Sequence, residues 1–274
     1  YKSVIMEIPS TTSSPSQLGG RASPLSLKEL LALNLPAAKW VVEGLVESGA
    51  VTMISALWGQ RKSWLCLHAA ICVAGGSPVF GVFATEMQGV LVINEEDTER
   101  QIQERMTILA PSSDDLPIFF LVGQGFRRND AGIAWIIAEA KSKGIGAIIF
   151  DSLRAIHGAD ENDSATMQII MNKLKILTHE GLSVIFTHHN RKPAIQKSGD
   201  SNGEETRGSG AINAAVHGHL SIEATKGEDG NEYVIIHQRK NKSAERVESF
   251  RVRVEKVDGH LSFVHAGKYK VENT

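Results

Sequence analysis

One short polar segment has the residue types and spacing of a phosphate-binding loop. Residues 56–63 read Ala-Leu-Trp-Gly-Gln-Arg-Lys-Ser and lie between an apolar run and a long helical pattern. The last two match the motif G-x-x-x-x-G-K-[ST], in which backbone N–H groups and a helix N-terminus hold the anion. Lys62 would reach the β- and γ-phosphates of a nucleotide, and the Ser63 hydroxyl would ligate Mg²⁺. We therefore expect a phosphate site made by Trp58, Gly59, Gln60, Arg61, Lys62, Ser63 and Trp64.

The loop departs from the motif at both glycine positions, which are occupied by Ala56 and Arg61. A glycine before the lysine lets the backbone approach the phosphate without a Cβ atom. Arg61 would therefore lower nucleotide affinity or abolish hydrolysis. The alternative is that Arg61 and Lys62 are solvated charges at the start of a helix whose N-cap is Ser63. The loop alone leaves both interpretations open.

Carboxylates follow two of the predicted strands. Asp151 ends the apolar run AIIFD, at the carboxyl edge of a parallel sheet where ligands bind in such folds, and is the predicted Mg²⁺ ligand. Glu95, Glu96 and Asp97 follow the run LVIN, and such adjacent acids repel one another unless they are solvated or near a cation. Glu96 is the predicted general base. The alternatives are that Asp151 forms a cap or turn and that the acidic trio caps the next helix.

A histidine pair follows a further strand. His188 ends the run SVIFTH and His189 comes next. A polar side chain at that edge would contact the γ-phosphate and report its loss to the following loop, a role that we predict for His188. Adjacent strand residues point to opposite faces, which argues against one metal bound by both histidines. A surface histidine pair is the alternative.

The segment Asn190–Arg207 is rich in Gly, Ser, Asn and basic residues. Long loops inside a compact domain are usually functional or disordered. Aromatic residues are absent from this segment, so any nucleic acid would be held through its phosphates, without sequence preference and with strong salt dependence. The alternative is a solvated mobile loop. The candidate DNA-binding residues are Arg191, Lys192, Lys197 and Arg207.

The elements predicted around these residues alternate between apolar strands and helices. Near-continuous apolar strands separated by helices indicate a parallel sheet covered on both faces, so the predicted fold class is α/β. Strands are predicted at Ala50–Ser55, Gly89–Asn94, Ile118–Val122, Gly146–Asp151 and Leu182–His188. Helices are predicted at Leu27–Leu33, Ala37–Glu47, Ser63–Ala74, Thr98–Ala110, Ala131–Lys143 and Ala165–Glu180.

Past Ala215 the pattern changes to strands separated by the turn signals GEDGN and VDGH. This predicts an antiparallel C-terminal extension with strands at His217–Thr225, Tyr233–Arg239, Ser249–Val257 and Leu261–His265. At the other end, Thr11–Ser26 is rich in Ser, Thr, Pro and Gly, a composition typical of a linker. We therefore predict a flexible arm over residues 1–26 and a single domain over residues 27–274.

Composition excludes several classes of protein. The 29 Lys and Arg residues are balanced by 31 Asp and Glu residues, for a formal net charge of −2, which excludes a histone-like basic coat. No apolar run reaches the roughly 18 residues of a membrane span, so we expect no membrane partner. The two cysteines, Cys66 and Cys72, have neither disulfide-framework nor metal-site spacing and fit a reducing compartment. We expect a cytoplasmic protein.

Taken in order, these segments resemble the RecA-like ATPases, and most closely the RepA-type hexameric plasmid helicases and the ATPase domains of phage and plasmid primase-helicases. The resemblance implies a RecA-like core and the cofactors ATP and Mg²⁺. It makes Lys62 and Ser63 similar to the Walker A lysine and hydroxyl, Asp151 to the Walker B acid, Glu96 to the glutamate that polarises water and His188 to the γ-phosphate sensor. The segments that carry it are ALWGQRKSWLCLHAAICVAGGSPVFG, VLVINEEDTERQIQERM, AIIFDSLRAIHGADEND, VIFTHHNRKP, TRGSGAINAA and HQRKNK.

The resemblance also implies an assembly and a role. Nucleotide would lie between the subunits of a homo-oligomer, as in a hexameric ring, with Arg239, Lys240 and Lys242 reaching the neighbour's site and Asn190–Arg207 facing single-stranded DNA in the channel. The expected activity is ATP hydrolysis coupled to translocation on DNA or unwinding of it during replication of a plasmid, phage or mobile element. An upstream or separate primase is a further expected partner. The alternatives are a nucleotide-binding DNA scaffold with little hydrolysis and a RecA-like recombination or regulatory ATPase.

Overall fold

The computed structural model describes residues 24–109, 115–126, 129–189 and 210–269. The chain divides into two compact units, Tyr1–Ala37 and Ala38–Thr274. In the first unit, helix α1 (Leu27–Leu31) begins with a capping box between Ser26 and Glu29. Residues 1–23 of the predicted arm lie outside the described residues. The predicted division lies at residues 26 and 27, whereas the second unit begins at Ala38.

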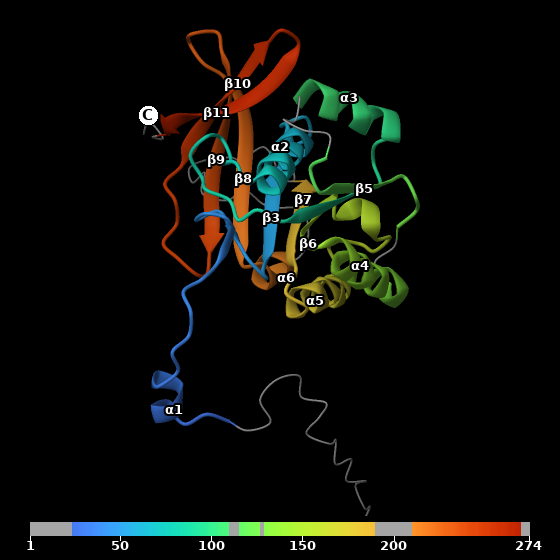
Figure 1. Ribbon diagram of the computed structural model, residues 1–274, viewed down its shortest axis with the longest axis vertical. Helices are drawn as coiled ribbons and strands as arrows, with labels where there is room; N and C mark the ends of the chain where they lie inside the picture. Colours follow the sequence, from blue (N-terminus) through green and yellow to red (C-terminus); the bar gives the residue numbers. More distant parts are fainter. Residues whose placement is uncertain (1–23, 110–114, 127–128, 190–209, 270–274) are drawn as a thin grey trace, which may run out of the picture. The chain divides into compact units, whose positions relative to one another are not determined.

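The second unit is built on a nine-stranded sheet with the order β11-β10-β9-β8-β3-β7-β6-β4-β5 (Figure 1). From β8 to β5 every pair of neighbouring strands is parallel. The carboxyl ends of these strands therefore lie along one edge of the sheet. The parallel strands are β3 (Val51–Ala56), β4 (Gly89–Asn94), β5 (Ile118–Val122), β6 (Ile145–Asp151), β7 (Ser183–His189) and β8 (Gly218–Lys226).

Three antiparallel strands extend the sheet beyond β8. Strands β8 and β9 form a hairpin in which Lys226 pairs with Glu232 next to the turn. This arrangement confirms the predicted antiparallel extension. The added strands are β9 (Glu232–Asn241), β10 (Phe250–Val257) and β11 (His260–Lys268).

Helices cover both faces of the sheet, as predicted, and each face has its own apolar core (Figure 1). One core contains residues of α2 (Lys62–Gly75) and α3 (Glu99–Leu109). The other contains residues of α4 (Asp130–Lys143), α5 (Ser164–His179) and α6 (Gly210–Ala215). Within the described ranges, none of these helices combines the length and apolar character that crossing a bilayer requires. The short helix α6 is not among the predicted elements.

The prediction of a helix over Ala37–Glu47 is wrong. The chain forms a small antiparallel hairpin there, β1 (Trp40–Val42) and β2 (Val46–Glu47), which turns through Gly44 at a φ of 68°. Val41, Val42, Leu45 and Val46 are spaced as on one face of a helix, yet all four are buried through the hairpin in the core that contains α2. A left-handed glycine and β-branched residues favour the hairpin over the helix.

Candidate functional site

The loop between β3 and α2 surrounds the ammonium group of Lys62. Lys62 is the first residue of α2 and is only 6% exposed. Its Nζ atom donates to the Leu57 carbonyl oxygen at 3.1 Å and lies 3.4 Å from the Ala56 oxygen and 3.3 Å from His189 Nδ1. Burial lowers the pKa of Lys62, and the charge of the Asp151 carboxylate opposes this shift. The structure therefore places a desolvated cation at the base of the predicted phosphate loop.

Arg61 has the backbone conformation that the motif normally assigns to glycine. Its φ is 63°, in the left-handed region. Its guanidinium forms two parallel bonds to the Glu232 carboxylate on β9, Nε to Oε1 at 2.5 Å and Nη2 to Oε2 at 2.7 Å. These bonds lower the pKa of Glu232. The side chain of Arg61 is thus held by a strand of the antiparallel extension.

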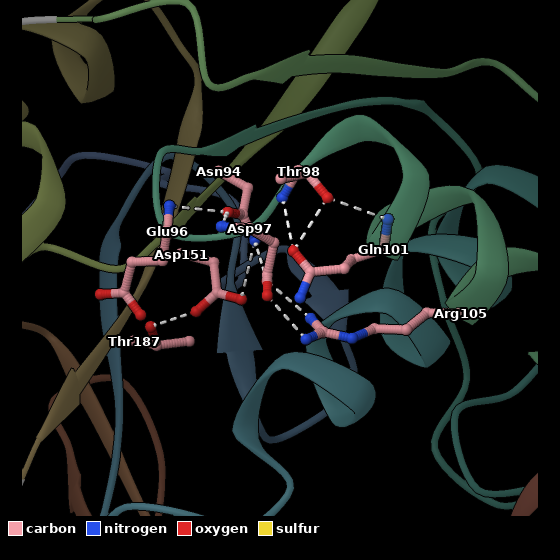
Figure 2. Close-up of polar contacts among 8 residues, drawn as sticks. All are labelled: Asn94, Glu96, Asp97, Thr98, Gln101, Arg105, Asp151 and Thr187. Atoms are coloured by element: carbon pink, nitrogen blue, oxygen red, sulfur yellow. Dashed lines mark hydrogen bonds and ion pairs between the residues drawn. The ribbon is translucent and has the colours of Figure 1, made fainter.

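Asp151 connects three strand ends and the loop. The residue is 6% exposed. Its carboxyl group accepts the Thr187 hydroxyl at 2.7 Å and lies 3.4 Å from Asn94 Nδ2 (Figure 2). Ser63 is a further neighbour of this carboxyl group. Burial raises the pKa of Asp151, whereas the bonds from Ser63 and Thr187 lower it. The two predicted Mg²⁺ ligands, Ser63 and Asp151, are far apart in the sequence and neighbours in the fold.

This pair of oxygen ligands fits Mg²⁺. A hydroxyl and a carboxylate are hard ligands, and Mg²⁺ is usually held by one or two carboxylates together with substrate phosphates rather than by an all-protein cage. Accordingly, the described part of the chain holds no group of three or more His, Cys, Asp or Glu side chains arranged for a metal. A cation beside the Asp151 carboxylate would offset the desolvation of its charged form.

The acidic trio after β4 is divided among different partners. Glu95 accepts the backbone N–H groups of Gly125 and Phe126, both at 2.9 Å, and so fixes the loop after β5. Asp97 forms a two-point ion pair with Arg105, at 2.7 Å for each contact (Figure 2). Both carboxylates are therefore engaged in holding the surrounding structure.

Glu96 is the exposed member of the trio, and together with Asp97 and the loop from Trp58 to Trp64 it lines an open pocket. One of its carboxylate oxygens accepts the hydroxyl of Ser152, the residue after Asp151. Its backbone N–H donates to Asn94 Oδ1 at 3.0 Å. The next helix, α3, is capped by a different pair of residues (Figure 2). The Thr98 N–H donates to the Gln101 side-chain oxygen, and the Gln101 N–H donates to the Thr98 hydroxyl oxygen. The three acids are therefore not the N-cap of this helix.

The two histidines at the end of β7 lie on opposite faces of the sheet. His189 is on the same face as Thr187, the partner of Asp151, and its Nδ1 atom lies 3.3 Å from Lys62 Nζ. His188, named as the γ-phosphate sensor from the sequence, does not line the pocket, whereas His189 does. Side chains alternate along a strand with a period of two, so counting from Thr187 places His189, and not His188, on the face that meets the pocket.

The pocket has a volume of about 440 Å³. This size is within the range of small-molecule sites. Residues of the predicted site that line it are those of the loop from Trp58 to Trp64, Glu96 and Asp151. The pocket is also lined by four residues to which the sequence patterns assign no role: Asp97, Arg105, His189 and Glu232. The guanidinium of Arg105 lies 5.9 Å from the Trp64 ring centroid, a cation–π contact that no local sequence pattern reveals.

The basic residues predicted at the end of β9 are not brought to this pocket. Lys240 pairs with His219 near the start of β8, and Lys242 donates its backbone N–H to His217, so both lie by the amino end of β3. Arg239 precedes them on β9. They could meet nucleotide only in another copy of the chain, which stays a prediction. The candidate DNA-binding residues lie outside the described residues: Arg191, Lys192, Lys197 and Arg207.

Two histidines, the buried His188 and the half-buried His68, predict acid sensitivity. His188 is 2% exposed, with its Nε2 atom 3.7 Å from Glu161 Oε1, and burial lowers its pKa to about 4. Burial likewise lowers the pKa of His68, which stacks on Phe80, to about 4. The folded state disfavours the charged imidazole. The contribution of each neutral histidine to the free energy of unfolding is therefore complete above about pH 6.5, the histidine pKa in the unfolded chain, and is lost as pH falls toward 4.

We therefore expect the free energy of unfolding to fall by about 2 kcal/mol per histidine between pH 7 and pH 5. Urea unfolding at both pH values measures this loss. The variant His188→Gln removes one titrating group, so its loss over the same interval should be about 2 kcal/mol smaller. Equal losses in the variant and the wild type would contradict the assignment of His188 as a buried neutral imidazole.

Comparisons with known proteins agree with this geometry. Residues 15–194 match the AAA domain family. The chain also superposes on a KaiC-like protein from the hyperthermophilic archaeon Pyrococcus horikoshii OT3, with a TM-score of 0.56 and 13% sequence identity, over 83% of this chain and 94% of that one. At that identity the likeness concerns the fold, and it confirms the predicted RecA-like α/β architecture. The chain therefore belongs to the AAA domain family, and its α/β fold is RecA-like.

Proposed function

We propose that this protein is a Mg²⁺-dependent ATPase that couples hydrolysis to movement on single-stranded DNA, as a RepA-type replicative helicase does. The observation that supports hydrolysis is the meeting of Lys62, Asp151 and Glu96 at one pocket. They come from the start of α2 and from the ends of two parallel strands. Phosphoryl transfer needs a cation at the β/γ-phosphates, a metal-binding carboxylate and a group that orients water.

Each group has a distinct part in the reaction. Loop N–H groups and the Lys62 ammonium would hold the β- and γ-phosphates of ATP, and the ammonium stabilises the charge that builds up on them. Ser63 and Asp151 would hold Mg²⁺, which when bound supplies further charge neutralisation. The Glu96 carboxylate would orient a water molecule toward the γ-phosphorus and accept its proton. The Ser152 hydroxyl, bonded to Glu96, restrains that carboxylate.

The connection to DNA is supported by the course of β7. His189, beside Lys62, is followed directly by the segment Asn190–Arg207 with its four basic residues. A change at the γ-phosphate would therefore be transmitted along one strand to the start of this segment. In a homo-oligomeric ring, the segment would contact DNA phosphates, and the basic end of β9 would meet the neighbour's nucleotide.

ATP turnover measured with and without single-stranded DNA tests the proposal. We expect DNA to raise turnover and the stimulation to weaken with added salt, because the contacts are to phosphates. The double variant Arg191→Ala/Lys192→Ala should lose the stimulation. Its matched control is Lys141→Ala/Lys143→Ala, which removes the same charge from α4. Stimulation that survives in the first variant and in high salt would contradict a phosphate contact by this segment.

A nucleotide-binding scaffold with little hydrolysis is the second candidate, and the observation behind it is Arg61 in place of glycine. The left-handed backbone of Arg61 favours a working loop instead. ATP binding without turnover, in the presence and absence of DNA, would establish the scaffold. Electron microscopy of the assembled protein distinguishes a further alternative: a helicase is expected to form a closed ring, whereas a strand-exchange ATPase is expected to form a filament.

A further inference from the structure

Two side chains of the phosphate loop, those of Gln60 and Arg61, form hydrogen bonds to the same hairpin. The Arg61 guanidinium bonds to Glu232 at the start of β9, and the Gln60 side-chain oxygen accepts the backbone N–H of Ala224 on β8. Glu232 is paired with Lys226 beside the turn of this hairpin. The tip of the β8–β9 hairpin therefore holds the loop from one side, at the rim of the pocket that Glu232 also lines.

The loop needs such a support because of its residue types. Glycine populates positive φ about as readily as negative φ, whereas a residue with a Cβ atom does so several-fold less. Arg61 is held at a φ of 63°. Its ion pair with Glu232 is half-buried, with side-chain exposures of 28% and 35%, and has the two-point geometry that fixes orientation as well as distance.

We propose that Glu232 is a positioning residue for nucleotide binding: by holding the Arg61 side chain it keeps the loop backbone in the conformation that glycine provides in other phosphate loops. This inference rests on the proposed binding of ATP at this loop. The ion pair between Arg61 and Glu232 thus takes the place of the readiness with which glycine adopts a positive φ.

The proposal predicts that the effects of substitutions at the two positions depend on each other. Glu232→Ala leaves Arg61 without its partner, so the loop spends less time in the binding conformation and ATP affinity falls by about 5- to 10-fold. Arg61→Gly removes the need for a partner and should change affinity by less than about threefold. The double variant Arg61→Gly/Glu232→Ala should bind ATP nearly as well as the wild type, although Glu232→Ala alone does not.

Titration with a fluorescent ATP analogue measures these affinities, and turnover separates binding from chemistry. Because Glu232 does not touch the reacting atoms, Glu232→Ala should raise KM and leave kcat within about twofold. The conservative variant Glu232→Gln keeps one hydrogen-bond acceptor and should show an intermediate loss. Glu228→Ala, which removes an exposed acid from the same turn, is the matched control and should bind like the wild type. Circular dichroism checks that each variant is folded.

Two results would overturn the proposal. One is wild-type affinity in Glu232→Ala, and the other is a double variant that binds as weakly as Glu232→Ala alone. The second result would mean that Glu232 acts independently of the Arg61 backbone. A wild-type chain that binds no ATP would instead overturn the proposed function, and the inference with it. This result differs from the first two, in which the wild type binds.

Discussion

Replacing Lys62 with alanine is expected to lower ATP turnover by at least about 10²- to 10³-fold, the scale for removal of a preorganised electrostatic group. The reason is the pairing of the other pocket cations. Arg61 is bonded to Glu232 and Arg105 to Asp97, each through two contacts, whereas Lys62 donates to loop carbonyl groups. Lys62 is therefore the cation in this pocket that can turn to phosphate without breaking an ion pair.

A steady-state ATPase assay measures this loss. The size-matched variant Lys62→Met keeps the packing of the buried stem and should be equally inactive, which separates the loss of charge from a loss of folding. The control is Lys141→Ala. Lys141 is an exposed lysine of α4 that is paired with Glu180 and lies far from the loop in sequence. Turnover unchanged in both Lys62 variants would show that phosphate is not bound at this loop.

The second large effect is expected at Glu96. Glu96→Gln removes the proton acceptor and retains the size of the side chain and its bond to Ser152, so ATP should still bind while turnover falls by about 10²-fold or more. Single-turnover hydrolysis and titration with an ATP analogue distinguish the two steps.

Glu95→Gln is the matched control for this experiment. Glu95 bonds to the backbone N–H groups of Gly125 and Phe126, so the substitution should lower the free energy of unfolding by about 1–3 kcal/mol, the scale of hydrogen bonds to a charged group. Turnover of the folded variant should change little by comparison. Turnover lost in Glu95→Gln and kept in Glu96→Gln would transfer the role of general base to Glu95.

The parallel core was predictable because its strands are uninterrupted apolar runs bounded by polar residues. The bounds of β4 and β5 agree with the prediction at every residue. The hairpin of β1 and β2 was not predictable in this way, because its buried residues are also spaced as on a helix, and only packing decides between the two.

The candidate site was predictable to the extent that its residues follow strand ends. Lys62, Asp151 and Glu96 are marked by local patterns, and the structure brings them to one pocket. The ion pair of Arg61 with Glu232 joins residues 171 positions apart and has no local signature. His189 rather than His188 lines the pocket because side chains alternate between the two faces of a strand. Which face meets the pocket is fixed by the bond of Thr187 to Asp151, which the sequence does not reveal.

The position of β3 in the sheet has a consequence for the order of folding during synthesis. This strand pairs with β7 and β8, both of which follow it by more than a hundred residues, and the loop after it is anchored to Glu232 later still. Contacts of such long sequence separation form slowly, and a ribosome adds only about 5–20 residues per second. The nascent chain therefore holds its central strand unpaired for several seconds, and its nucleotide loop gains its anchors only after most of the chain has been made.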